Sequence, residues 1–193
     1  MTISNNSTGL RPGVCLSTTR PVAPYEGQMI YETDTDMVAI WNGTAWRYIA
    51  STTPTNGTVL QVVNSTTNSQ ALNGSSTFID TNLAATITPK STTSKILVIA
   101  NQNGLYKTGS NTRIQLKLFR STTEILNFEN YGLLTSSSAD NAIGSSSVTY
   151  LDSPSTSSAV TYKTQFASGG NTANVYVQAS SSSSSMTLME IAG

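Results

Sequence analysis

The sequence contains no histidine, and its single cysteine is Cys15. Ser-His-Asp and Cys-His catalysis need an imidazole base, and the usual zinc and iron sites need several His or Cys ligands. One cysteine cannot form a disulfide within the chain. The sequence also has neither the Gly-x-Gly-x-x-Gly fingerprint nor a phosphate-binding P-loop. These absences predict a protein without metal or cofactor, and they exclude the enzyme classes that depend on such residues.

Charge is also scarce in this sequence. Asp, Glu, Lys and Arg make up 10% of the 193 residues, and the formal net charge is zero, whereas charged residues are about 25% of an ordinary globular protein. The chain therefore has no overall field that would attract nucleic acid or an anionic membrane. Its longest apolar run, residues 96–100, is too short to span a bilayer. We expect neither nucleic-acid binding nor membrane insertion, and synthesis in a cytoplasm, since residues 1–6 do not resemble a secretory signal.

Short runs rich in β-branched and aromatic residues fill most of the sequence. Several alternate strictly between apolar and polar residues, as in residues 112–120, and turn signals recur between them, a pattern typical of a sandwich or barrel. The strands expected after residue 57 are 58–63, 77–79, 84–88, 95–101, 112–120, 124–128, 147–151, 159–166, 174–179 and 186–191. A single helical turn is expected at residues 140–143. The fold class predicted is all-β, with an antiparallel jelly-roll-like sandwich in this part of the chain.

The first part of the chain has a different character. Residues 1–27 are rich in glycine and proline and are expected to form an irregular, extended arm, ordered from Met1 because it lies on another surface. Residues 28–32, 37–41 and 45–49 are expected to form a three-stranded meander. Asn-Gly at positions 42 and 43 predicts a type I′ turn, which would place Trp41 and Trp46 opposite each other.

A linker at residues 50–57 separates these two parts. We therefore predict an N-terminal arm and β-hairpin attachment module at 1–54 and a jelly-roll-like β domain at 55–193. The serine tract 180–185 is expected to be a flexible loop. The strand that follows it is expected to lie centrally in a sheet.

Carboxylates leave one hydrolytic possibility open. Glu124 and Glu129 are candidates for the acid pair of a glycosidase, although ordinary surface glutamates explain them better. Asp34 and Asp36 are interpreted as residues of a solvated hairpin turn. A calcium site at these two aspartates is the alternative, without the glycine and glutamate of an EF-hand loop.

Aromatic residues near the longer connections of the second part could bind a sugar. Phe128 and Tyr150 are better explained as core residues of strands. Tyr106 and Tyr131, which lie close to Gly104 and Gly132, are the candidates for exposed receptor-binding residues, because functional residues concentrate on loops.

One stretch of the sequence resembles a known module. Residues 20–34 read Arg-Pro-Val-Ala-Pro-Tyr-Glu-Gly-Gln-Met-Ile-Tyr-Glu-Thr-Asp, and residues 41–46 read Trp-Asn-Gly-Thr-Ala-Trp. This pattern is similar to a recurrent module of tailed-phage virion proteins, found in tail fibres, baseplate-associated adhesins and capsid decorations ahead of a variable β domain. The resemblance is specific over residues 20–49 and looser at residues 150–154 and 186–191.

The resemblance implies that the module docks on the virion and that the β domain is homotrimeric and projects outward. The residues that would dock are Arg20, Pro21, Pro24, Tyr25, Trp41 and Trp46. Because no heptads or shaft repeats lie between the two parts, a short tail fibre or adhesin is the leading hypothesis. The alternatives are a capsid decoration protein and a carbohydrate-active enzyme. The expected partners are further copies of the chain, other virion proteins of the tail, baseplate or capsid, and host-surface carbohydrate.

Overall fold

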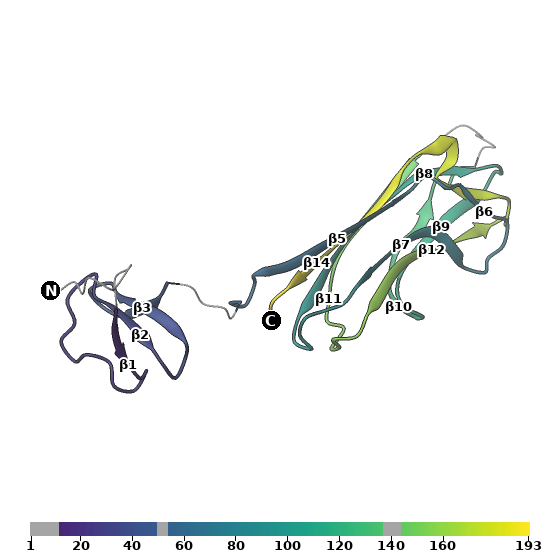
Figure 1. The fold of residues 1–193 in the computed structure, drawn as a ribbon. Helices are drawn as coiled ribbons and strands as arrows, with labels where there is room; N and C mark the ends of the chain where they lie inside the picture. Colours follow the sequence, from purple (N-terminus) through teal and green to yellow (C-terminus); the bar gives the residue numbers. More distant parts are fainter. Residues whose placement is uncertain (1–11, 50–53, 137–143) are drawn as a thin grey trace. The chain divides into compact units, whose positions relative to one another are not determined.

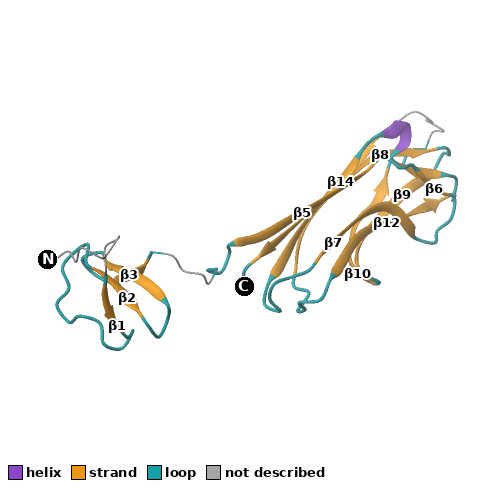
Figure 2. Cartoon of the chain, viewed as in Figure 1, coloured by secondary structure: helices purple, strands orange, loops and turns teal. Residues whose placement is uncertain are grey.

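The computed structural model describes residues 12–49, 54–136 and 144–193. The chain divides into two compact units, Met1–Pro54 and Thr55–Gly193 (Figure 1). Strands account for nearly all the regular structure, and the described residues contain no α-helix and one short 3-10 helix (Figure 2). The all-β class predicted from the sequence is confirmed. The turn expected at residues 140–143 and the arm as far as residue 11 lie outside the described residues.

The first unit is a four-stranded sheet in the order β1-β2-β3-β4. Its strands are β1 (Gly13–Cys15), β2 (Met29–Glu32), β3 (Met37–Trp41) and β4 (Trp46–Tyr48). The meander predicted over residues 28–49 is present. The expectation of an irregular arm was wrong for residues 13–15, which form a parallel strand on β2. The segment between β1 and β2 closes on its own sheet, since the carboxylate of Asp34 accepts hydrogen bonds from the backbone nitrogen and hydroxyl of Ser17.

The turn between β3 and β4 differs from the expected two-residue type I′ turn. Trp41 pairs with Trp46, so the loop contains the four residues 42–45. Only Gly43 in this loop has a positive φ, of 92°. The side-chain oxygen of Asn42 accepts hydrogen bonds from the backbone nitrogens of Thr44 and Ala45. Asparagine thus closes the turn through its side chain, as in an Asx-turn, instead of adopting the left-handed conformation.

The second unit, called the β domain below, contains ten strands and the 3-10 helix η1 (Ala179–Ser181). The strands are β5 (Val59–Thr67), β6 (Ala71–Asn73), β7 (Ile79–Ile87), β8 (Lys95–Lys107), β9 (Thr112–Arg120), β10 (Thr123–Gly132), β11 (Gly144–Asp152), β12 (Val160–Gly170), β13 (Val175–Val177) and β14 (Ser184–Ile191). β6 was not predicted. In place of the two runs predicted at 77–79 and 84–88 there is one strand, β7, which begins at Ile79 and continues past Asn82 despite its φ of 68°.

The strands form two sheets that enclose the core (Figure 1). One sheet has the order β10-β9-β12-β7 and the other contains β5-β14-β8, with β11 on the free side of β8 and with β13 and β6 at one end. When the eight long strands are numbered along the chain, the sheets read 2-7-4-5 and 1-8-3-6, and all neighbouring pairs are antiparallel. This order is the double Greek key of a jelly roll, so the predicted fold is confirmed.

The C-terminal strand lies inside its sheet. β14 pairs with β5 on one side and β8 on the other, as predicted from the sequence. The serine tract before it was expected to be a loop, but Ser184 and Ser185 belong to β14 and residues 179–181 form η1. This helix lies close to β8 where glycine is required: a Cβ on Gly104 would lie 2.5 Å from the nitrogen of Ala179.

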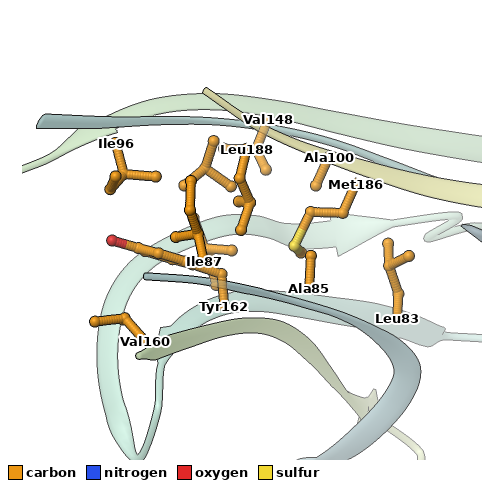
Figure 3. Close-up of a cluster of buried hydrophobic side chains, with 12 residues drawn as sticks. Leu83, Ala85, Ile87, Ile96, Ala100, Val148, Val160, Tyr162, Met186 and Leu188 are labelled. Atoms are coloured by element: carbon orange, nitrogen blue, oxygen red, sulfur yellow. The ribbon is translucent and has the colours of Figure 1, made fainter. Parts of the chain in front are cut away.

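The inward faces of the two sheets form the main hydrophobic cluster (Figure 3). Leu83, Ala85 and Ile87 of β7 and Val160 and Tyr162 of β12 face residues of the other sheet, including Ile96, Ala100, Val148, Met186 and Leu188. Phe128 and Tyr150 pack against it, as predicted. Burial of one such Leu or Ile side chain contributes about 1.5–3 kcal/mol. A second cluster contains Leu105, Ile114, Leu116, Phe166, Val175 and Val177.

A buried polar group connects the two sheets. The hydroxyl of Thr164 in β12 donates to the side-chain oxygen of Gln102 in β8 at 3.0 Å. The Gln102 nitrogen donates to the hydroxyl of Ser184 at 3.0 Å, and the amide of Gln178 lies 2.9 Å from the same hydroxyl. All four residues are fully buried. Since polar groups away from water must be paired, this group fixes the alignment of the two sheets.

A second polar bridge joins the two sheets at β11. The carboxylate of Asp152 in β11 accepts bonds from the Tyr162 hydroxyl at 2.6 Å and from the Arg120 guanidinium at 3.0 Å. Burial, together with this hydrogen bond, raises the pKa of Tyr162 well above its ordinary value. The phenol therefore stays protonated and donates to the carboxylate.

Candidate functional site

The first unit contains a buried carboxylate at its centre. Glu32 of β2 is fully buried, and its oxygens accept bonds from the guanidinium of Arg20, from the hydroxyl of Tyr48 at 3.0 Å and from that of Thr35 at 3.1 Å. Arg20 also donates to the Tyr48 hydroxyl at 2.9 Å. The hydrogen bond from Arg20, opposed by burial and supported by those from Tyr48 and Thr35, holds the pKa of Glu32 below its ordinary value.

This network gives two residues of the recurrent module a structural role. Arg20 and Glu32 hold the segment before β2 against the sheet, and Tyr48 connects both to β4. The guanidinium of Arg20, expected to dock on a partner, is thus directed toward the interior of its own unit. Its side chain is still 31% exposed.

The two tryptophans expected to dock are also paired within the unit. The Trp41 and Trp46 rings lie 5.6 Å apart at an interplanar angle of 60°, an edge-to-face arrangement. Both are half-buried. Such a pair contributes about 0.5–1.5 kcal/mol beyond its buried area.

We expect Trp46→Ala to destabilise the first unit by about 2 kcal/mol, because it removes this pair and half-buried aromatic surface. Fluorescence of the remaining Trp41 reports on this unit alone, as these are the only two tryptophans in the chain. The thermal transition of the β domain should not change. Arg47→Ala, at the exposed position next to Trp46, is the matched control. Loss of the β-domain transition in Trp46→Ala would contradict the independence of the two units.

The remaining docking candidates lie on the segment before β2. Tyr25 is 71% exposed, and Pro21 and Pro24 are half-buried. Sequence reasoning missed Val22, whose side chain is completely exposed. Its signal in the sequence was its position between the two prolines, Pro21 and Pro24. Val22 and Tyr25 are the most exposed apolar side chains of this segment, and Leu16 at its start is 44% exposed.

The two receptor-binding candidates lie in different sheets. Tyr106 of β8 is half-buried and packs on Tyr176 of β13, with ring centroids 5.3 Å apart. Tyr131 of β10 is 63% exposed, and the guanidinium carbon of Arg113 lies 4.5 Å from its ring centroid. The structure places the two tyrosines in different sheets, and Tyr131 is the more exposed of the two.

Tyr131 belongs to a surface that we call the polar face, the outward side of the sheet β10-β9-β12-β7. Its outward side chains include Arg113, Gln115, Lys117, Lys163 and Gln165, which alternate with buried residues. Beside Tyr131, the side-chain oxygen of Asn130 accepts bonds from Gln115 at 3.4 Å and from Asn127 at 2.9 Å. Further along the face, the ammonium of Lys117 lies 4.3 Å from the ring centroid of Phe78.

Two carboxylates of the polar face are bound by cations of the same face. Lys117 pairs with Glu124 at 2.7 Å and Lys163 with Asp80 at 2.9 Å. Burial by itself would raise the pKa of Asp80, but the hydrogen bonds from Lys163 and Gln165 outweigh it and lower the pKa. Glu129, the other catalytic candidate, accepts a bond from the Tyr131 backbone nitrogen. The face therefore presents planar amide, guanidinium and aromatic groups, together with paired charges.

The two aspartates considered for calcium accept hydrogen bonds from neighbouring side chains. Asp34 binds Ser17, and Asp36 accepts a bond from the Tyr31 hydroxyl at 2.7 Å. In the part of the chain that the structure describes, no group of three or more Cys, Asp or Glu residues is placed to hold a metal ion. Within the same residues, no helix has the length and hydropathy needed to cross a membrane.

Comparison with known proteins gives only a remote likeness. No protein-family model and no curated protein matches this chain. Among solved structures, the VP2 subviral particle of infectious bursal disease virus is 9% identical, with a TM-score of 0.43 over 83% of this chain and 41% of that chain. The structure of the Gx strain of the same virus is 10% identical, with a TM-score of 0.46 over 81% of this chain and 42% of that chain. The chain thus spans about two fifths of the length of these viral chains, and a likeness this remote carries no information about what it binds.

Proposed function

We propose that this protein is a structural component of a tailed-phage virion. It docks on the particle through the first unit and presents the β domain to the host surface. In this proposal it is a short homotrimeric tail fibre or adhesin without enzymatic activity. The proposal rests on the resemblance of residues 20–49 to the recurrent virion module. It is supported by the division of the chain into two units, of which the first contains that whole stretch.

In this proposal, docking uses the exposed part of the first unit. The internal bonds of Arg20 and the tryptophan pair make the unit rigid, so little conformational entropy is lost when it binds. Tyr25 and Val22 then provide the apolar contact area. The separate β domain can vary without disturbing this attachment.

Host binding is assigned to the polar face around Tyr131. An exposed aromatic ring beside amide and guanidinium donors suits the apolar faces and hydroxyl groups of a sugar. The ring is already held by Arg113, which reduces the entropy lost on binding. Three such sites on one trimer would give avidity to a weak individual contact.

We expect Tyr131→Ala to weaken binding of the purified protein to host cells at least about tenfold, because a central aromatic contact is lost three times per trimer. Tyr131→Phe should retain most of the binding, since the ring face makes the contact. Tyr25→Ala, the same change at an exposed tyrosine of the other unit, is the matched control and should bind cells normally. Equal cell binding by Tyr131→Ala and the unchanged protein would refute this assignment. If Tyr106→Ala alone lost cell binding, the receptor-binding site would lie on β8 instead.

Imaging of the intact particle with this protein labelled tests the location. The proposal expects label at the tail or baseplate, in at most a few dozen copies. Hundreds of copies over the head would identify a decoration protein instead. Release of reducing sugar from host polysaccharide, abolished by Glu124→Gln or Glu129→Gln, would instead support a carbohydrate-active enzyme.

A further inference from the structure

The outward side of the second sheet differs sharply from the polar face. On the four strands β5-β14-β8-β11, the residues that alternate with the buried core are apolar or uncharged polar residues. Among these described positions, Lys95 is the only charged residue. We call this side of the sheet the uncharged face.

An apolar row crosses the whole uncharged face. The strand register places Met189 of β14 between Val62 of β5 and Leu97 of β8, and it places Leu97 beside Leu151 of β11. Val62 is 55% exposed and Leu151 is 48% exposed, and the two central side chains are half-buried. On one side the next row contains Asn64, Thr187, Ile99 and Thr149, and on the other Ile191 lies between Val59 and Lys95. A contiguous apolar surface with a polar border is typical of an interaction site.

We infer that the uncharged face is the surface through which copies of this chain associate with one another. A face almost without charge can pack against another copy of the chain without like-charge repulsion, whereas a partner that binds by charge would find hardly any complementary group on it. Depletion of charge at the centre is the feature that separates interface cores from ordinary surface. The charges of the β domain are concentrated instead on the polar face, which stays in water.

The size of the face fits this role. Its four strands are about 4.8 Å apart, and with roughly seven paired residues of about 3.4 Å each they span on the order of 400 Å² in projection. The accessible surface exceeds the projection because side chains protrude. A standard interface buries about 800 Å² on each partner and the smaller ones less than about 600 Å², so this face has the size of a small interface.

This inference depends on the proposed trimer only for the number of copies. In a trimer with threefold symmetry each contact joins two different patches, so the β5 side of the uncharged face would meet the β11 side of the next copy. The polar face, which includes Tyr131, lies on the opposite side of the sandwich from the uncharged face and stays exposed. One sheet of the jelly roll thus serves assembly and the other serves recognition.

The test measures the mass of the full chain by sedimentation, with Val62→Lys and Leu151→Lys introduced together. Both positions are half-exposed in the single chain, so the substitutions should leave the fold of the monomer intact. The unchanged chain should be a multimer, and the variant should associate at least about a hundredfold more weakly, because like charges then meet in the interface. Ala84→Lys with Thr123→Lys adds the same charge at exposed positions of the other sheet and should leave the mass unchanged.

Two outcomes would overturn the inference. An unchanged multimer mass in the Val62/Leu151 variant, with equal far-ultraviolet dichroism and thermal transition, would exclude this face and leave the trimer itself in place. A monomeric mass of the unchanged chain at every concentration would exclude self-association altogether. Neither result bears on the virion location, which imaging of the labelled particle decides separately. If the lysine variant does not fold, Val62→Ser with Leu151→Ser replaces it, with a smaller but measurable weakening expected.

Discussion

Glu32→Ala should unfold the first unit while the β domain stays folded. The substitution removes the acceptor of three side chains, Arg20, Tyr48 and Thr35, from a fully buried position. Removing one partner of a buried ion pair costs about 3–5 kcal/mol, and the lower end applies here since solvent partly reaches Arg20. A unit this small has a stability of only about 3–5 kcal/mol. The unfolded form of the unit should therefore be substantially populated.

Tryptophan fluorescence measures this directly, because both tryptophans lie in the first unit. Denaturant titration should show the tryptophan transition shifted toward zero denaturant, with the dichroism transition of the β domain unmoved. Glu32→Gln keeps the shape and loses the charge, so an intermediate effect is expected. Glu26→Ala, at an exposed glutamate of the same unit, is the control. A tryptophan transition that is the same in Glu32→Ala and Glu26→Ala would show that the buried network does not hold the unit together.

The same carboxylate makes the first unit sensitive to acid. Its pKa in the folded unit lies below the ordinary value of 4.5, mainly because of the hydrogen bond from Arg20. A lowered folded pKa means that the stabilisation is complete above the unfolded-state pKa and is lost as the pH falls through the folded value. Asp34, whose pKa is lowered by its bonds from Ser17, acts in the same direction. The denaturant midpoint of the tryptophan transition should therefore fall below about pH 4.5. Glu32→Gln should remove most of this pH dependence.

Gln102→Ala should produce the largest loss of stability in the β domain, about 3–5 kcal/mol. The substitution leaves a cavity between the sheets, and it leaves Thr164 and Ser184 without the partner that joins them. Both residues are fully buried, so water cannot replace the lost amide without entering the core. The β domain should unfold at lower denaturant, with the tryptophan transition of the first unit unchanged.

A second variant separates the two causes of this loss. Gln102→Leu fills most of the volume but still removes one hydrogen bond from each hydroxyl, so it should cost about 1–3 kcal/mol. Thr164 keeps its bond with Thr81, and Ser184 keeps its bond from the Asn103 backbone nitrogen. Gln115→Ala removes the same side chain from the outward side of the neighbouring sheet and should cost little. If the β domain unfolds at the same denaturant concentration in Gln102→Ala and Gln115→Ala, the buried polar group around Gln102 does not stabilise the contact between the sheets.

Local patterns predicted most of the fold. The alternation in residues 112–120 fixed which side of β9 is buried, because successive side chains of a strand point to opposite faces. The same period of two indicated the buried sides of β12 and β13. Most strand boundaries were predicted to within four residues, but β8 continues six residues past the predicted end at residue 101. The short strand β6 and the four-residue turn at Asn42 were missed, since each depends on contacts that local propensity does not contain.

The candidate sites were predicted less completely, for a physical reason. Sequence reasoning could identify Arg20, Trp41 and Trp46 as unusual residues, but whether they face a partner or each other depends on the register of β3 with β4 and on Glu32. Glu190 illustrates the same limit: it alternates with Met186 and Leu188 and is fully buried, with its carboxylate bound by Gln61 and by the Lys90 backbone nitrogen. Its alternation was visible in the sequence, but its partners lie far away along the chain.

The sequence by itself determined the all-β class, the central C-terminal strand and the absence of histidine chemistry, because composition and period-two alternation are local properties. Only the tertiary structure decided that Tyr106 packs on Tyr176 while Tyr131 is exposed, since their sheets are assembled from strands far apart in the sequence. It also decided that charge lies on one outer face of the sandwich and is nearly absent from the other. The pairing of β5, β14, β8 and β11 aligns four separate apolar residues into one row, and no single stretch of the sequence contains that row.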